Sequence, residues 1–160
     1  MKNEKTEKKN IVFIPSEWNL SWKYAAGEVG NKYIAELRDN ARIFATRCIK
    51  CNRIFLPPQA YCERCFIWIK DNWVELQPKA TLKAFTIVTE AFGGHKEPPF
   101  VMGYFKVDKA DTNIPNFLEN VDLSNIEEAR KKIKVGMPID MIFKEHRVGN
   151  EQDYYFRIRE

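Results

Sequence analysis

The four cysteines of this chain stand in two pairs, and their spacing constrains the fold more than any other feature of the sequence. Each pair encloses two residues, and ten residues separate the pairs. Two intervening residues let both sulfurs of a pair turn toward one point, so two such knuckles supply the four thiolates of a tetrahedral metal site. We therefore expect a rubredoxin-like zinc ribbon whose ligands are Cys48, Cys51, Cys62 and Cys65.

Zinc is the metal that this pattern favours, and iron is the alternative. A rubredoxin uses the same four thiolates for iron and would make the protein an electron carrier. The Pro inside and the Gly after the knuckles of a rubredoxin are absent from Cys48-Ile-Lys-Cys51-Asn52. Thiolate preference therefore favours zinc. Four thiolates leave no position for water, so we expect the zinc to be structural and noncatalytic.

The residues around the cysteines predict the rest of a ribbon over residues 42–76. Residues 42–47 and 52–57 are expected to be the strands of a hairpin, with Asn52 in the left-handed conformation that Asn tolerates better than most residues. The apolar residues after the second knuckle, Phe66 and Trp68 among them, predict a ribbon face that lies against the next unit.

The N-terminal part divides into a tail and a helical segment. The first ten residues are polar and without periodicity, which predicts a flexible tail over residues 1–14. Apolar residues then recur every three or four positions, which predicts an amphipathic helix within residues 15–41. Gly27 and Gly30 each cost about 1 kcal/mol in a helix interior, so a bent pair of helices is an equal alternative.

Two tryptophans one helical turn apart, Trp18 and Trp22, give this segment a large apolar face. The face either packs on the chain's own ribbon or barrel, or binds a partner protein, since Trp is enriched in the hot spots of interfaces. Both interpretations stay open on the sequence, and the two residues are our candidates for a partner interface.

Residues 77–160 carry the pattern of a small β-barrel. Apolar and polar residues alternate over residues 80–88, which predicts a strand. Further strands are expected at residues 100–108, 139–144 and 154–158. A capping box from Ser124 to Glu127 predicts one short helix among them. Short strands with one inserted helix indicate an OB-fold barrel, so we expect a mainly β protein.

The sequence offers no catalytic constellation. With its cysteines committed to a metal, the chain has none left to attack a thioester. We expect His95 and His146 to be solvated loop side chains, and Asp108 and Asp111 to cap the loop that holds them. No phosphate-binding loop or nucleophile elbow is present in the sequence. We therefore expect a protein that is not an enzyme on its own.

Lysines next to aromatic residues mark a candidate ligand site on the barrel. The residues are Lys83, Phe85, Tyr104 and Lys106, on strands expected to be adjacent. OB-folds use such groups to stack bases and contact phosphates of single-stranded nucleic acid. The same groups suit the adenine and the 3'-phosphate of coenzyme A. In a third interpretation, Phe85 packs under the ribbon and the lysines are merely solvated.

The net charge and the hydropathy pattern limit the classes of partner that this protein is expected to bind. The formal charge is +4, but residues 1–10 hold four Lys and two Glu, so the remainder is only mildly basic. This argues against nucleic acid and suits one phosphorylated small molecule. No apolar run approaches the roughly 20 residues that span a bilayer, and the start lacks a secretory signal. We expect a soluble cytoplasmic protein without a membrane partner, consistent with metal-binding thiolates in a reducing compartment.

The order of these parts resembles a known family, in which a helix, a four-cysteine zinc ribbon and an OB-fold follow one another. The family has long been catalogued as a domain of unknown function and is found beside acyl-CoA enzymes. The matching stretches are Arg47-Cys-Ile-Lys-Cys51, Pro57-Pro58, Cys62-Glu-Arg-Cys65, Trp73-Val74, Ala80-Thr-Leu-Lys-Ala-Phe-Thr86, Pro98-Pro-Phe100, Ala110-Asp-Thr112 and Val135-Gly-Met137. They cover the chain from about residue 18 to its C-terminus.

The resemblance implies a noncatalytic accessory subunit that binds a thiolase-fold enzyme and helps to hold the coenzyme A part of an acyl-CoA. The partner would then perform the Claisen or retro-Claisen chemistry. Hydroxymethylglutaryl-CoA synthase and MaoC-like hydratases are alternative partners within the family. The Trp-rich start is similar to accessory subunits of thiolases of aromatic-compound degradation. A single-stranded nucleic-acid-binding OB-fold protein is the alternative function.

Three departures from the family pattern leave the metal site intact. Asn52 replaces the usual Gly after the first knuckle, and Ala80 stands where Gly is common. The insertion over residues 113–134 is also longer than is typical. These departures bear on the pathway in which the protein acts rather than on its fold.

Overall fold

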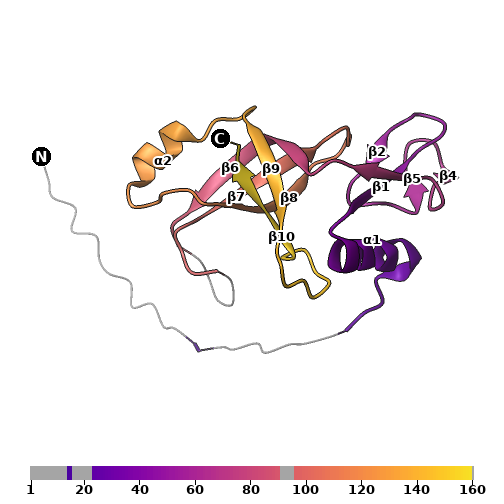
Figure 1. The fold of residues 1–160 in the computed structure, drawn as a ribbon, viewed down its shortest axis with the longest axis horizontal. Coiled ribbons are helices and arrows are strands. Elements are labelled where there is room, and N and C mark those ends of the chain that lie inside the picture. Colours follow the sequence, from indigo (N-terminus) through magenta and orange to yellow (C-terminus); the bar gives the residue numbers. More distant parts are fainter. Residues whose placement is uncertain (1–13, 16–22, 91–95, 160) are drawn as a thin grey trace, which may run out of the picture.

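Five strands of the C-terminal part close into one barrel (Figure 1). The computed structural model describes residues 14–15, 23–90 and 96–159. The barrel strands are β6 (Lys79–Val88), β7 (Phe100–Val107), β8 (Ile114–Glu119), β9 (Pro138–Phe143) and β10 (Tyr154–Ile158). They follow the order β10-β8-β7-β6-β9, and only the β10–β8 pair is parallel. The expected OB-type barrel is confirmed.

A β-bulge sets which side chains of β6 face outward. Leu82 pairs with Phe105 and Ala84 pairs with Tyr104, so Lys83 is the extra residue. Leu82 is buried, whereas Ala84 and Tyr104 are both exposed on the outer face of the sheet. Gly103 faces the interior, where a Cβ would lie 2.8 Å from Cζ of Phe105. The packing of the barrel interior therefore determines which side chains of β6 and β7 point outward.

The zinc ribbon lies beside the barrel and consists of two small sheets (Figure 1). Strand β1 (Ile43–Arg47) pairs antiparallel with β2 (Ile54–Phe55) and β5 (Trp73–Leu76). Strands β3 (Tyr61–Cys62) and β4 (Ile67–Trp68) form the second sheet. The expected hairpin around the first knuckle is confirmed, and Asn52 has the expected left-handed backbone with a φ of +59°.

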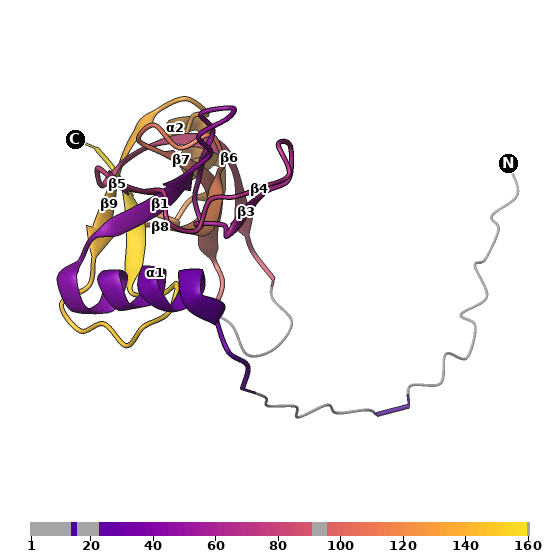
Figure 2. The ribbon, with the colours of Figure 1, turned by 90° about the vertical axis from the view of Figure 1, so that its right-hand side faces the viewer.

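Helix α1 (Gly27–Asn40) lies along the ribbon and the end of the barrel (Figure 2). Gly27 is the first residue of the helix and has a φ of +72°. It therefore marks the start of the helix and does not interrupt one, as the sequence had allowed. Residues 23–26 are not helical, and Trp18 and Trp22 lie outside the described residues. The buried side chains of α1 are Val29, Tyr33 and Leu37. Among the described residues, no helix has the length and apolar content needed to cross a membrane.

Helix α2 (Ile126–Lys132) is the short helix that the sequence predicts between two barrel strands, but its cap is shifted by one residue. Asn125 is the N-cap, and its side chain accepts a hydrogen bond from the Glu128 N–H at 3.2 Å. Ser124 instead donates its N–H to Oδ1 of Asp122 at 3.0 Å. The expected capping box at Ser124 is therefore wrong, because this residue is held in the preceding turn.

One hydrophobic core joins the helix, the ribbon and the barrel. It includes Tyr33 and Leu37 of α1, Ile43 and Leu56 of the ribbon, and barrel residues such as Phe105. A second, smaller cluster lies within the ribbon around the cysteines. The shared core fixes the position of the metal site relative to the barrel surface.

The loop between β9 and β10 is built around the buried carboxylate of Asp153. This carboxylate accepts hydrogen bonds from the backbone N–H groups of Val148, Gly149 and Asn150 at 2.9, 2.7 and 3.2 Å. Burial raises the pKa of Asp153, but the three N–H groups lower it more, so the pKa lies below its usual value. The charged form is therefore the one that stabilises the fold.

We expect Asp153→Asn to lower the free energy of unfolding at pH 7 by about 1–3 kcal/mol, because an amide replaces a charge-assisted acceptor. Because the native pKa is depressed, this stabilisation is present above pH ~4 and is lost as the pH falls through the native pKa. Urea unfolding at pH 7, 5 and 3 measures the effect, with exposed Asp71→Asn as the control. A deficit of equal size at pH 3 and pH 7 would contradict the role of the charge.

Candidate functional site

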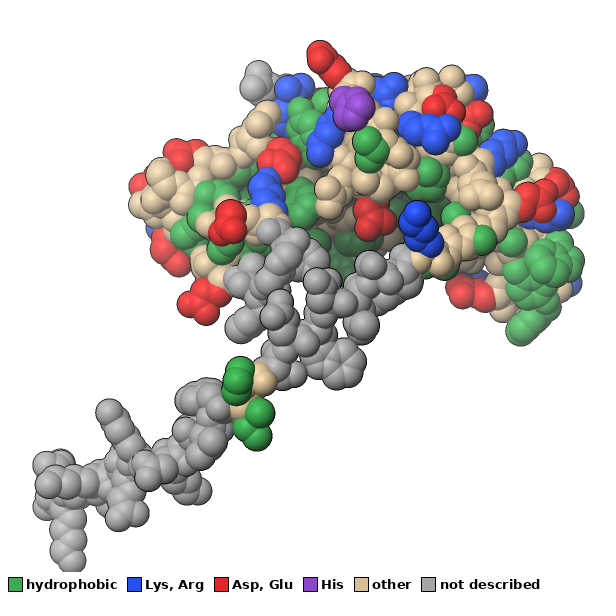
Figure 3. All heavy atoms as spheres, turned by 90° about the horizontal axis from the view of Figure 1, so that it is seen from below, with side chains coloured by type: hydrophobic (Ala, Val, Ile, Leu, Met, Phe, Trp, Pro, Cys, Tyr) green, Lys and Arg blue, Asp and Glu red, His purple; other side chains and the backbone are tan. Residues whose placement is uncertain are grey.

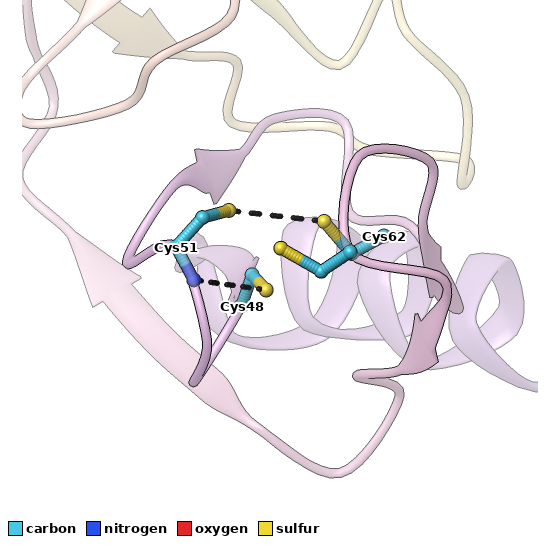
Figure 4. A group of neighbouring side chains, drawn as sticks. Cys48, Cys51 and Cys62 are labelled. Carbon is cyan, nitrogen blue, oxygen red and sulfur yellow. Dashed lines mark hydrogen bonds between the residues drawn. The ribbon is translucent and has the colours of Figure 1, made fainter.

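The four cysteine sulfurs come together from the two knuckles, as Figure 4 shows for Cys48, Cys51 and Cys62. All four sulfurs lie within 4.8 Å of one another, and the sulfurs of Cys51 and Cys62 are 3.8 Å apart. Four thiolates at zinc–sulfur distances of about 2.3 Å in a tetrahedron are separated by about 3.8 Å. The donor set and its spacing therefore fit zinc.

Each knuckle is closed by the same backbone hydrogen bond. The Asn52 N–H donates to the Cys48 carbonyl at 2.8 Å, and the Phe66 N–H donates to the Cys62 carbonyl at 2.9 Å. Both residues after the knuckles are left-handed, with φ of +59° and +55°. The Cys51 N–H also points to the sulfur of Cys48 at 3.5 Å (Figure 4). The backbone hydrogen bonds of the two knuckles thus hold the four sulfurs in place.

The pKa values of Cys48 and Cys65 shift in opposite directions, because negative charge on one thiolate disfavours negative charge on its neighbours. Burial raises the pKa of Cys48, but the N–H groups of Cys51 and Lys50 and the neighbouring thiols lower it to about 6. Burial and the neighbouring thiols raise the pKa of Cys65 to about 12. A cluster this tight does not hold four negative charges without a cation, and a divalent metal supplies the missing charge. The site is a structural zinc centre with no open coordination position.

Two of the four candidate ligand residues line a single hollow on the barrel. Phe85 and Tyr104 both line a cavity of about 310 Å³ at β6 and β7, but Tyr104 is exposed on the outer face, whereas Phe85 pairs with the inward-facing Gly103. Its other lining residues are Ala84, Thr86, Met102, Gly103 and Pro115. Lys83 and Lys106 are not part of this lining: Lys83 is the bulge residue, and Lys106 pairs with Thr81 toward the start of β6. Phe85 packs against the barrel core.

A second cavity, which the sequence analysis did not anticipate, adjoins the first. It has a volume of about 410 Å³, and helix α1, the ribbon residue Pro57 and the barrel all line it. It shares Met102 and Pro115 with the first cavity. Tyr33 and Tyr154 face it, and burial raises the pKa of both hydroxyls. Its residues are far apart in sequence, so no local pattern could have revealed it.

The remaining candidate residues that the structure describes do not form a catalytic arrangement. The Asp111 carboxylate accepts a hydrogen bond from the Ile54 N–H at 2.8 Å, and the Asp108 carboxylate accepts one from the Gln77 N–H at 3.2 Å. Both carboxylates therefore satisfy backbone N–H groups. His146 is exposed and has no side-chain hydrogen bond to another described residue. His95 lies outside the described residues.

Two family models match the chain, one over each half of the architecture. The rubredoxin-like zinc ribbon domain of ChsH2 matches residues 36–67, and the C-terminal OB-fold domain of ChsH2 matches residues 73–144. The chain belongs to this zinc-ribbon and OB-fold family. The sequence motifs had indicated this family, and the indication is confirmed. A search of the curated proteins finds no match.

Solved structures with the ChsH2-type fold include two that cover most of this chain. One is a protein of unknown function from the DUF35 family of Sulfolobus solfataricus, with 22% identity and a TM-score of 0.59 over 83% of this chain and 87% of that one. The other is described as an Ltp2-ChsH2(DUF35) aldolase, with 20% identity and a TM-score of 0.58 over 80% of this chain and 93% of that one. At this level of identity, the two structures establish a shared fold.

Proposed function

We propose that this protein is a noncatalytic accessory subunit that binds a thiolase-fold enzyme and helps to hold the coenzyme A part of its acyl-CoA substrate. The observation that carries the proposal is membership of the ChsH2 family, together with similarity to a chain described as part of an Ltp2-ChsH2(DUF35) aldolase. The closed metal centre supports it, because the chain's cysteines are occupied in holding zinc. The reacting groups would come from the partner enzyme, with aromatic-compound degradation as the pathway that we propose.

The hollow beside Tyr104 is the part of the barrel that we propose for coenzyme A. Tyr104 is 53% exposed on the outer face of the barrel, where its ring can stack on a flat base. Lys83 and Lys106 lie on the same two strands and would contact the phosphates from outside the hollow. The apolar lining between them suits the uncharged arm of the coenzyme.

Co-expression with a thiolase-fold enzyme from the same source organism tests the accessory role. We expect the two proteins to co-elute at a fixed ratio and the enzyme to be more active with acyl-CoA in the complex than alone. A chain that elutes alone and leaves the enzyme's activity unchanged would contradict the proposal.

We expect Tyr104→Ala to raise the KM of the complex for acyl-CoA about tenfold, because loss of one stacked base costs roughly 1–3 kcal/mol. Tyr24→Ala is the matched control, since Tyr24 is 82% exposed and lies outside the barrel. Calorimetric titration with coenzyme A and with a single-stranded oligonucleotide separates the two ligand classes. An unchanged KM refutes the base-stacking role, and oligonucleotide binding that weakens steeply with salt would support the nucleic-acid alternative.

A further inference from the structure

Three aromatic side chains project from the second sheet of the ribbon, and we call them the ribbon aromatic patch: Tyr61, Phe66 and Trp68. Their exposed fractions are 38%, 75% and 69%. Tyr61 and Trp68 are cross-strand partners on β3 and β4, and Phe66 lies in the turn that joins these strands. Figure 3 shows hydrophobic side chains gathered at this end of the molecule. The sequence predicted that the apolar side of the ribbon would lie against the next unit of the chain. Val74 does pack against the shared core, but the exposure of Phe66 and Trp68 shows that the prediction is wrong for these two residues.

The backbone conformation of Phe66 indicates that the ribbon aromatic patch has a function. Phe66 has a φ of +55°, a conformation that bulky side chains rarely adopt. The corresponding position after the first knuckle holds Asn52, which adopts the same conformation more easily. The chain therefore carries a strained aromatic residue where a smaller one would close the knuckle, and its side chain gains little burial within the fold. Such strain is often found at functional sites.

The three rings form a compact cluster. The Tyr61 ring lies edge-on to that of Trp68 with centroids 5.4 Å apart, and edge-on to that of Phe66 with centroids 6.5 Å apart. Rings at steep angles to one another do not offer the parallel faces on which successive bases stack. They form instead a rounded apolar projection of the kind that fills a recess in a protein surface.

The charged residues of the ribbon indicate the chemistry of the partner. Between Arg47 and Asp71, the ribbon holds five basic and two acidic side chains. Arg53 pairs with Glu63 at 3.9 Å, and Lys70 pairs with Glu28 outside this range at 2.9 Å. The other three basic side chains are exposed and have no salt bridge to a described residue: Arg47, Lys50 and Arg64. The ribbon is thus net basic over this range, and Arg64, one of these three, lies in the same turn as Phe66.

We propose that the ribbon aromatic patch docks into an apolar recess rimmed by carboxylates on the partner enzyme subunit. This inference rests on the proposed function, and it places the interface on the ribbon, away from the hollow beside Tyr104. Phe66 and Trp68 fill the recess, and Arg64 and Lys50 face its acidic rim. The zinc centre acts here as the rigid base that presents the patch.

The test compares binding of two double variants to the same thiolase-fold enzyme after purification. Phe66→Ser with Trp68→Ser is expected to weaken binding at least tenfold while zinc content and melting temperature are retained. Val135→Ser with Val148→Ser is the matched control, because these side chains are exposed to 60% and 59% on the barrel. We expect the control to bind as the wild type does. Arg64→Glu should also weaken binding, more strongly at low salt than at high salt.

A photo-crosslinking residue at position 68 adds a measurement that does not depend on affinity. A crosslink to the enzyme from position 68, and none from position 148, supports the interface. If the wild type binds and the Phe66/Trp68 variant binds equally well, the interface is elsewhere and the accessory role stands. If the wild type does not bind the enzyme, the proposed function fails and the interface fails with it. Binding of a single-stranded oligonucleotide that is lost in the Phe66/Trp68 variant would assign the patch to nucleic acid and overturn the proposal.

Discussion

Replacement of Cys65 by serine is expected to abolish zinc binding and to unfold the ribbon. Structural zinc contributes about 10 kcal/mol or more of folding free energy in small metal domains. The ribbon has little else to replace it, since among the described residues its inner cluster contains only Phe55 and Ile69 besides residues of the two knuckles and Ile67. Strands β1 and β2 also contribute to the core shared with helix α1 and the barrel. Loss of the metal is therefore expected to destabilise the whole chain.

Zinc content by mass spectrometry and thermal unfolding by circular dichroism measure this effect. Cys48→Ser should behave in the same way, and a strong chelator should lower the melting temperature of the wild type. Ile49→Ser is the matched control, because Ile49 lies between two ligands and is 70% exposed. A Cys65→Ser protein that stays folded without zinc would show that the knuckles do not depend on the metal.

The metal centre and the barrel could be predicted from the sequence because both depend on local patterns. The spacing of Cys48 to Cys65 determines which sulfurs meet, and the period-2 alternation over residues 80–88 predicts a strand that the structure shows as β6. The conformation of Asn52 could also be predicted, because left-handed backbone after a knuckle is a local requirement.

The features that could not be predicted depend on packing between distant segments. The side of the ribbon that carries Phe66 and Trp68 points away from the core, although apolar residues usually indicate burial. The cavity between Tyr33 and Tyr154 forms only where α1 meets the barrel. The bulge at Lys83 puts Ala84 on the outer face and turns Phe85 toward the barrel core, because one extra residue reverses the alternation of the strand.

Four hydrogen bonds join the ribbon to the loop between β7 and β8, in a stretch where the sequence predicted only a loop cap. Asp111 accepts the Ile54 N–H through its carboxylate and donates its own N–H to the Ile54 carbonyl, both at 2.8 Å. The Thr112 hydroxyl accepts the Leu56 N–H and donates to the Leu56 carbonyl, both at 2.7 Å. Leu56 is fully buried, so Thr112 satisfies two backbone groups that solvent does not reach.

We expect Thr112→Val to lower the free energy of unfolding by about 2–4 kcal/mol. Valine has the shape of threonine but leaves the buried N–H and C=O of Leu56 without partners, and each unsatisfied group costs roughly 1–3 kcal/mol. Urea unfolding followed by circular dichroism measures the loss. Thr112→Ser keeps the hydroxyl and should restore most of the stability, whereas exposed Thr89→Val should have little effect. If Thr112→Val were as stable as the wild type, the two Thr112–Leu56 hydrogen bonds would contribute nothing to holding the ribbon to the barrel.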